Sequence, residues 1–296
     1  MIRHLQAAGR RVQRVKQPVV GRDARARKSV EQGGLACIRV ADQRHDGNGV
    51  LHAALTLRGA HAAHLVQLRL QAGDALADVA AVLYGEPADT LWLFIHGQFG
   101  CKEEALPFAE IVTPDAQVLS IDLPNHGTRQ NRNEEFAPWA AAPELTRVMA
   151  YARAHWRATN VRATSIGAYF ARLAFAAPEK ALFVSPIVDM ERLICDRICA
   201  AGITEQILRE RGMYPAREGD MLSWDYLCWV RAHPAKDWHC PQYILYGEND
   251  SMTDLATIRT YMAKSGAELS IVPQGEHWFH TPEQLAVMAD WERKHK

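Results

Sequence analysis

Three residues of the types used in nucleophilic catalysis each follow a separate apolar stretch of the sequence. Ser165 lies in the segment ATSIG, Asp250 in LYGEND and His277 in QGEHWFH. A serine that is activated by a histidine, which a carboxylate orients, attacks carbonyl carbons. Each residue alone has a simpler role, as a helix cap, a turn residue or a packed histidine. In combination they predict a Ser-His-Asp triad.

Two of these three positions have a competitor nearby. Asp189 follows an apolar run at residues 181–184 and is an alternative acid, although we favour Asp250. His280 lies three residues beyond His277 and is an alternative base. Replacing Asp250 by Asn separates the two acids, because the loss of the true acid leaves the histidine in the wrong tautomer.

A glycine-containing loop, FIHGQFG, comes directly after a strongly apolar run. Gly97 and Gly100 allow the backbone to fold back with its amides exposed. Such amides stabilise the negative oxygen of a tetrahedral intermediate, together with the amide that follows the nucleophile. The candidate oxyanion donors are therefore the backbone N–H groups of Gln98 and Ile166. An ordinary glycine turn is the alternative.

Apolar runs alternate with segments of helical periodicity from residue 78 onward, which predicts an α/β fold with a mostly parallel sheet flanked by helices. We expect strands at 79–84, 91–95, 118–121, 161–164, 181–184, 243–246 and 269–272, and helices at 102–111, 143–156, 166–176, 253–265 and 282–296. Residues 187–238 have helical periodicity and no convincing strand. An insertion there would lie over the carboxyl ends of the strands, as a helical lid placed before the acid-bearing strand.

The order Ser, Asp, His along the chain resembles that of the α/β-hydrolase superfamily. The segment DLPNHG is similar to the Asp-x-x-Gly-His-Gly stretch of that fold, with Asn125 in the glycine position. Ala163 stands where the usual G-x-S-x-G motif has its first glycine. The resemblance covers residues 78–296 and is strongest to serine aminopeptidases, monoacylglycerol lipases and small carboxylesterases.

The resemblance implies a serine hydrolase that cleaves a carboxylic ester, a thioester or a small amide through an acyl-enzyme. It implies no cofactor and no metal. The implied substrate is a small or lipid-like acyl compound, and an acyltransferase or a non-catalytic binding protein on the same scaffold are the alternatives. The implied site comprises the catalytic Ser165, Asp250 and His277, the oxyanion amides of Gln98 and Ile166, and the candidate substrate contacts Phe99, Trp224 and Trp278.

The 296 residues divide into two parts of unlike composition. The first 83 hold no Trp, Tyr or Phe, and residues 1–80 carry 13 basic against 6 acidic side chains, a formal charge of +7. We interpret residues 1–77 as a poorly ordered basic extension outside the functional domain at 78–296, which translation from an upstream start codon would explain. A nucleic-acid-binding or membrane-binding arm, a transit peptide, a secretory signal and a small packed cap are the alternatives. A helix is expected over 60–76.

The composition excludes other classes of protein. The whole chain has no net charge and residues 81–296 are net acidic, which argues against a nucleic-acid partner. Apolar runs are shorter than the roughly 18 residues of a membrane span. Six cysteines at irregular spacing in a long chain are typical of a reducing compartment, and we expect a cytoplasmic protein. The oligomeric state is left open.

Overall fold

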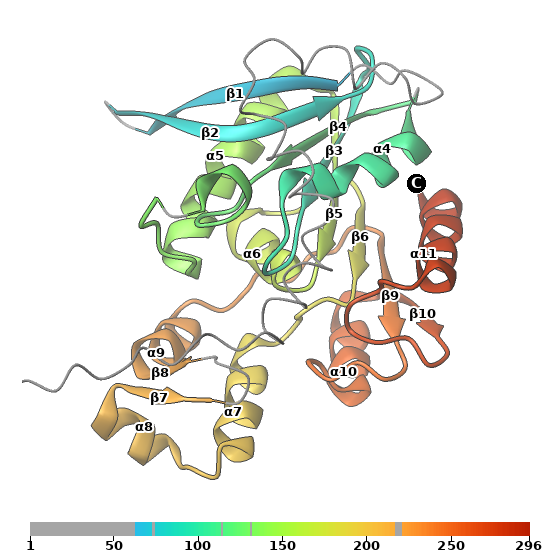
Figure 1. The fold of residues 1–296 in the computed structure, drawn as a ribbon. Helices are drawn as coiled ribbons and strands as arrows, with labels where there is room; N and C mark the ends of the chain where they lie inside the picture. The colour runs from blue at the N-terminus through green and yellow to red at the C-terminus, as the bar shows by residue number, and fades with distance from the viewer. Residues whose placement is uncertain (1–62, 73–74, 114, 131, 217–220) are drawn as a thin grey trace, which may run out of the picture.

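A computed structural model describes residues 63–72, 75–113, 115–130, 132–216 and 221–296. Its centre is an eight-stranded sheet in the order β1-β2-β4-β3-β5-β6-β9-β10 (Figure 1). The β2 strand pairs antiparallel with both β1 and β4, and the remaining pairs are parallel. The strands are β1 (Ala63–Ala72), β2 (Ala75–Tyr84), β3 (Thr90–Ile95), β4 (Gln117–Ile121), β5 (Ala158–Thr164), β6 (Ala181–Val184), β9 (Gln242–Gly247) and β10 (Glu268–Val272).

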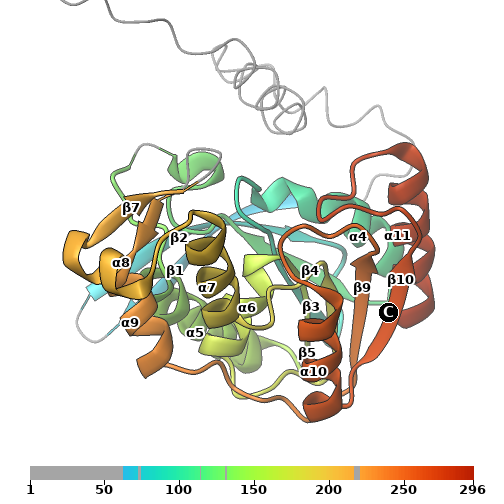
Figure 2. The same ribbon diagram turned by 90° about the horizontal axis from the view of Figure 1, so that it is seen from below.

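Helices cover both faces of this sheet (Figure 2). They include η2 (Lys102–Ala105), α4 (Leu106–Val112), α5 (Pro138–His155), α6 (Ile166–Ala174), α10 (Leu255–Ser265) and α11 (Pro282–His295). Side chains of α4 and α11 belong to one buried cluster, and those of α5, α6 and α10 belong to the other. Strand β3 contributes side chains to both clusters, from Leu91, Leu93 and Ile95 on one face and from Trp92 and Phe94 on the other. This alternation is why its sequence is apolar throughout.

A lid of helices and a short hairpin follows β6 (Figure 1). It comprises α7 (Met190–Ala200), α8 (Glu205–Arg211), β7 (Met213–Pro215), β8 (Met221–Ser223) and α9 (Trp224–Ala232). The expectation of a segment without strands was wrong, because β7 and β8 pair as an antiparallel hairpin. Among the helices of the described residues, none has both the length and the apolar character needed to cross a membrane.

The expected α/β architecture, its strands and the helical lid are confirmed, but the N-terminal edge of the sheet differs from the prediction. The helix expected over 60–76 is wrong, because β1 runs through most of that range and pairs along its length with β2. Strand β2 also begins at Ala75, so the domain boundary expected after residue 77 falls inside a strand. Residues 1–62 lie outside the described part of the chain.

Candidate active site

Ser165 lies on a sharp turn between β5 and α6, with a backbone φ of +51°. The turn is held by backbone bonds: the N–H of Ser165 donates to the carbonyl of Val184, and its own carbonyl accepts from Ala168 and Ile187. Ala163, in place of the usual glycine, is fully buried in β5 and fits without distortion of the strand. This strained turn lifts the serine side chain above the carboxyl end of the sheet.

Gly167 lets α6 approach the end of β3. A Cβ at this position would lie 2.5 Å from the carbonyl oxygen of His96 and 2.8 Å from that of Ile95. We expect Gly167→Ala to lower the free energy of unfolding by about 1–3 kcal/mol, because backbone must shift to make room. Urea denaturation checks this against Gly97→Ala, whose Cβ would meet its nearest neighbour at a milder 3.3 Å. Equal stability losses in the two variants would contradict the prediction.

The three predicted catalytic residues lie in one hydrogen-bonded chain. The Ser165 Oγ is 2.8 Å from Nε2 of His277, and Nδ1 of the same ring is 2.8 Å from Oδ2 of Asp250. Ser165 is 8% exposed, the His277 side chain 18% and the Asp250 side chain 0%. This geometry allows the imidazole to take the serine proton while the carboxylate holds its other nitrogen.

The carboxylate of Asp250 is fixed by its own turn after β9. Its Oδ1 accepts the backbone N–H groups of Met252 at 2.8 Å and Thr253 at 3.1 Å, which leaves Oδ2 to face His277. The neighbouring Asn249 donates its N–H to the carbonyl of Gly275, so the acid loop and the histidine loop are joined directly.

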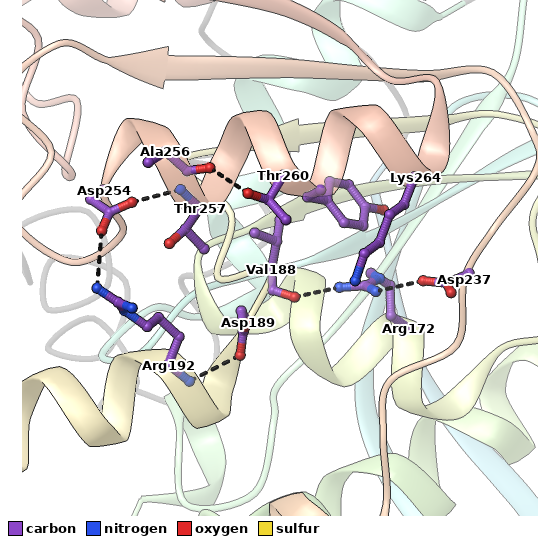
Figure 3. A pocket seen from close by; sticks show the side chains of 11 residues that line it. Arg172, Val188, Asp189, Arg192, Asp237, Asp254, Ala256, Thr257, Thr260 and Lys264 are labelled. Atoms are coloured by element: carbon purple, nitrogen blue, oxygen red, sulfur yellow. Dashed lines mark hydrogen bonds and ion pairs between the residues drawn. The ribbon is translucent and has the colours of Figure 1, made fainter.

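The alternative acid Asp189 and the alternative base His280 make contacts outside the chain of Ser165, His277 and Asp250. Asp189 caps α7 by accepting the N–H of Arg192 at 2.9 Å, and it lines a separate cavity of about 330 Å³. Figure 3 shows this cavity, in which Arg172 lies between the carbonyl of Val188 and the carboxylate of Asp237. His280 is 41% exposed, and its Nδ1 contacts the carbonyl of Trp278.

The glycine loop passes beside the nucleophile. A Cβ on Gly97 would lie 3.3 Å from the Cβ of Ser165. Gln98 and Ile166, whose amides are the candidate oxyanion donors, line the same cavity, which has a volume of about 280 Å³. The loop is closed by a bond from the N–H of Gly100 to the carbonyl of Gly97 at 3.2 Å.

This cavity is mainly apolar, and residues of the lid form part of its wall. Tyr226 of α9 and Phe136, which precedes α5, supply its aromatic side chains. The other described residues in its lining are Ile187, Met190, Leu193, Ile194, Arg197, Met221, Leu222, Ser223 and Met252. A cavity of this size and character suits an apolar acyl group.

The three expected substrate contacts are not among the described lining residues. Phe99 and Trp278 are 83% and 54% exposed, respectively. Trp224 packs on the core beneath the guanidinium of Arg209. Trp224 and Tyr226 are two residues apart on α9, which places them on different faces of the helix. Trp224 was the residue predicted on this helix, and neither Tyr226 nor Phe136 was identified from the sequence as a lining residue.

The segment DLPNHG forms a second loop against the glycine loop. Asp122 is fully buried and forms an ion pair with Lys102 at 2.7 Å. Burial raises the pKa of Asp122, but the hydrogen bonds from Lys102 and Thr128 outweigh it and hold that pKa below its usual value. Asn125 has a φ of +58°, which explains why this position accepts glycine or asparagine.

Two buried histidines join these loops. His96 receives the N–H of Leu123 on Nε2 at 3.0 Å, while its Nδ1 lies 2.7 Å from the carbonyl of Gly97. His126 receives the N–H of Phe99 on Nε2, also at 3.0 Å. The two ring centroids are 5.3 Å apart. From the sequence, this segment is identified only by its resemblance to the Asp-x-x-Gly-His-Gly stretch, and its link to the glycine loop is not predicted.

His96 should make the fold sensitive to acid. Burial lowers the pKa of His96 from 6.5 to about 4. Between these two pH values the histidine is protonated in the unfolded chain and neutral in the folded chain. The free energy of unfolding should therefore fall as the pH drops from about 6.5 to about 4, by an amount on the order of 3 kcal/mol. Urea denaturation across this range measures the loss. His96→Gln, which keeps an acceptor for Leu123, should have a shallower profile, and a parallel one would contradict the assignment.

Comparison with known proteins identifies the fold. No protein-family model and no curated protein matches the chain. Solved structures do: a provisionally named hydrolase from Agrobacterium vitis is 15% identical, with a TM-score of 0.62 over 79% of this chain and 98% of the other. Est1E from Butyrivibrio proteoclasticus, solved with ferulic acid, is 17% identical, with a TM-score of 0.61 over 73% and 93%. An esterase from Pyrococcus furiosus is 11% identical, with a TM-score of 0.55 over 84% and 92%. The chain has the α/β-hydrolase fold.

Proposed function

We propose that this protein is a serine hydrolase that cleaves a carboxylic ester through a covalent acyl-enzyme. The observation that carries the proposal is the chain of two 2.8 Å contacts from Ser165 through His277 to Asp250. The chain ends in a fully buried carboxylate, as expected for a group that holds the histidine tautomer and stabilises its cation.

The proposed reaction has two halves. In the first, His277 removes the proton of Ser165 as its Oγ attacks the carbonyl carbon, and then gives that proton to the leaving group. In the second, a water molecule attacks the acyl carbon with the same histidine as base. The bond from that carbon to Ser165 Oγ then breaks, the histidine returns the proton to Oγ, and the carboxylic acid leaves. The backbone N–H groups of Gln98 and Ile166 stabilise the oxyanion in both halves, and loss of one such donor typically raises the barrier by about 2.7–4 kcal/mol.

The acyl group is proposed to occupy the 280 Å³ cavity bounded by Phe136 and Tyr226. Its apolar lining supports a compact apolar or aromatic acyl group. The ferulic acid bound to Est1E, an aromatic carboxylic acid in a protein of the same fold, is in keeping with this choice. Thioesters and small amides would use the same residues.

Labelling with a fluorophosphonate probe tests the proposal. Intact-mass measurement should show one adduct on the folded wild type and none on Ser165→Ala, because only an activated serine reacts. A panel of p-nitrophenyl esters of increasing acyl length then defines the preferred acyl group. Absence of an adduct on the folded wild type would count against an assembled triad, and an adduct that persists in the variant would identify another nucleophile.

A further inference from the structure

The hydrogen bonds of His126 define which of its ring nitrogens carries a proton. Nδ1 lies 2.8 Å from the carbonyl oxygen of Pro124, which only accepts. Nδ1 is therefore the protonated nitrogen, and the lone pair of Nε2 accepts the N–H of Phe99. Burial lowers the pKa of His126, which keeps the ring neutral and this lone pair available near pH 7.

The bond to Phe99 stabilises the glycine loop in addition to the bond from the N–H of Gly100 to the carbonyl of Gly97. The Phe99 side chain is 83% exposed, and its backbone has a φ of +66°. A non-glycine residue adopts this conformation at a cost, so a local contact must stabilise it. Phe99 directly follows Gln98, whose N–H is the proposed oxyanion donor. The Phe99 N–H lies in the peptide that follows Gln98, one Cα away from the peptide that carries the Gln98 N–H. Fixing it therefore restrains the backbone torsions at Gln98 on which the direction of the Gln98 N–H depends.

The same ring also contacts the wall of the acyl cavity. Its centroid is 4.3 Å from that of Phe136, which lines the cavity with Gln98. His126 is itself only 5% exposed, so it has little freedom to move independently of either neighbour. It thus touches both the loop that carries the oxyanion donor and the wall that holds the acyl group.

We propose that His126 is a positioning residue for the oxyanion hole, which it orients by accepting the N–H of Phe99. This inference rests on the proposed hydrolase function. It predicts a loss in the chemical step, since an amide that is poorly aimed at the oxyanion weakens binding of the transition state more than binding of the substrate.

Two substitutions separate this role from simple packing. In His126→Gln the side-chain oxygen reaches the place of Nε2 and still accepts from Phe99. In His126→Asn the shorter amide reaches only the place of Nδ1, so the N–H of Phe99 loses its acceptor. We expect kcat of His126→Asn to fall at least about tenfold with KM little changed, and kcat of His126→Gln to stay within about threefold of wild type.

His155→Asn is the matched control, because this exposed histidine of α5 has a similar Nδ1 contact to a backbone carbonyl, that of Tyr151. Its kcat and KM should equal those of the wild type. Equal losses of kcat in the Asn and Gln variants of His126, or a loss confined to KM, would overturn the positioning role. A wild type that neither hydrolyses esters nor takes the probe would instead refute the proposed function itself.

A measurement on the wild type covers the case in which His126→Asn does not fold. Histidine labelled with ¹⁵N distinguishes the two neutral tautomers by NMR, and comparison with His126→Gln assigns the signals. We expect His126 to be the Nδ1–H tautomer with an unprotonated, hydrogen-bonded Nε2. A protonated Nε2 could not accept from Phe99 and would overturn the proposal.

Discussion

Under the proposed function, Ser165→Ala is expected to lower kcat for ester hydrolysis by about 10⁶-fold, as loss of the nucleophile does in a well-studied triad protease. The expected effect is large because, in the proposed mechanism, the three residues act as a unit: His277 and Asp250 would have no function in acyl transfer without the hydroxyl that they activate. The side chain is small and only 8% exposed, so its truncation should leave the fold intact. Hydrolysis of a p-nitrophenyl ester at saturating substrate measures the loss.

Ser185→Ala is the matched control for this variant. Ser185 follows β6 as Ser165 follows β5, is fully buried and also has a positive φ, of +44°. Its replacement should leave kcat within about threefold of wild type, because no hydrogen bond among the described residues joins its side chain to His277. If Ser165→Ala kept more than about 1% of the wild-type kcat, another residue would have to be the nucleophile.

The meeting of the three candidate catalytic residues could be predicted from the sequence because local rules fix their positions. A serine, an aspartate and a histidine that each follow a parallel strand must meet at the carboxyl edge of one sheet. Ser165, Asp250 and His277 do meet there, at hydrogen-bonding distance. This prediction did not require the full order of strands across the sheet. It required only that the three strands be parallel and lie close together.

The β1 strand was missed because its signal is ambiguous locally. Ala63, Val66 and Leu70 have helical spacing, but the segment Val66–Gln67–Leu68–Arg69–Leu70–Gln71 also alternates strictly between apolar and polar residues. Alternation with period two is the mark of a strand with one buried face. Antiparallel pairing with β2 over ten residues decides between the two patterns, and pairing between segments does not show in a local window.

The lining of the cavity was predictable only in part, because it depends on how the lid folds. Strands β7 and β8 are each three residues long, too short to give a periodic signal, yet their hairpin brings Met221 and Leu222 to the cavity. The choice of Tyr226 over Trp224 depends on which face α9 turns inward. The hydrogen bond from the N–H of Phe99 to His126 joins residues 27 positions apart, and neither residue type alone predicts it.

Asp250→Asn is expected to lower kcat by about 10⁴-fold while the fold is retained. Oδ1 of Asp250 accepts two backbone N–H groups, and Oδ2 accepts from Nδ1 of His277. An asparagine would keep its oxygen on the backbone donors and turn its NH₂ group toward the histidine. The ring would then have to offer an acceptor at Nδ1 and place its proton on Nε2, the nitrogen that must take the proton of Ser165.

Asp189→Asn separates this catalytic effect from the general cost of losing a carboxylate near the lid. Its side chain caps α7, whose residues Met190 and Leu193 line the cavity. Asparagine is itself a good cap, so the free energy of unfolding should change by less than about 1 kcal/mol and kcat by only a few-fold.

The dependence of kcat on pH distinguishes the two variants. Asp250→Asn should regain activity at alkaline pH, where hydroxide can replace the missing base, and Asp189→Asn should follow the wild type throughout. If the two variants exchanged these behaviours, Asp189 would be the catalytic acid.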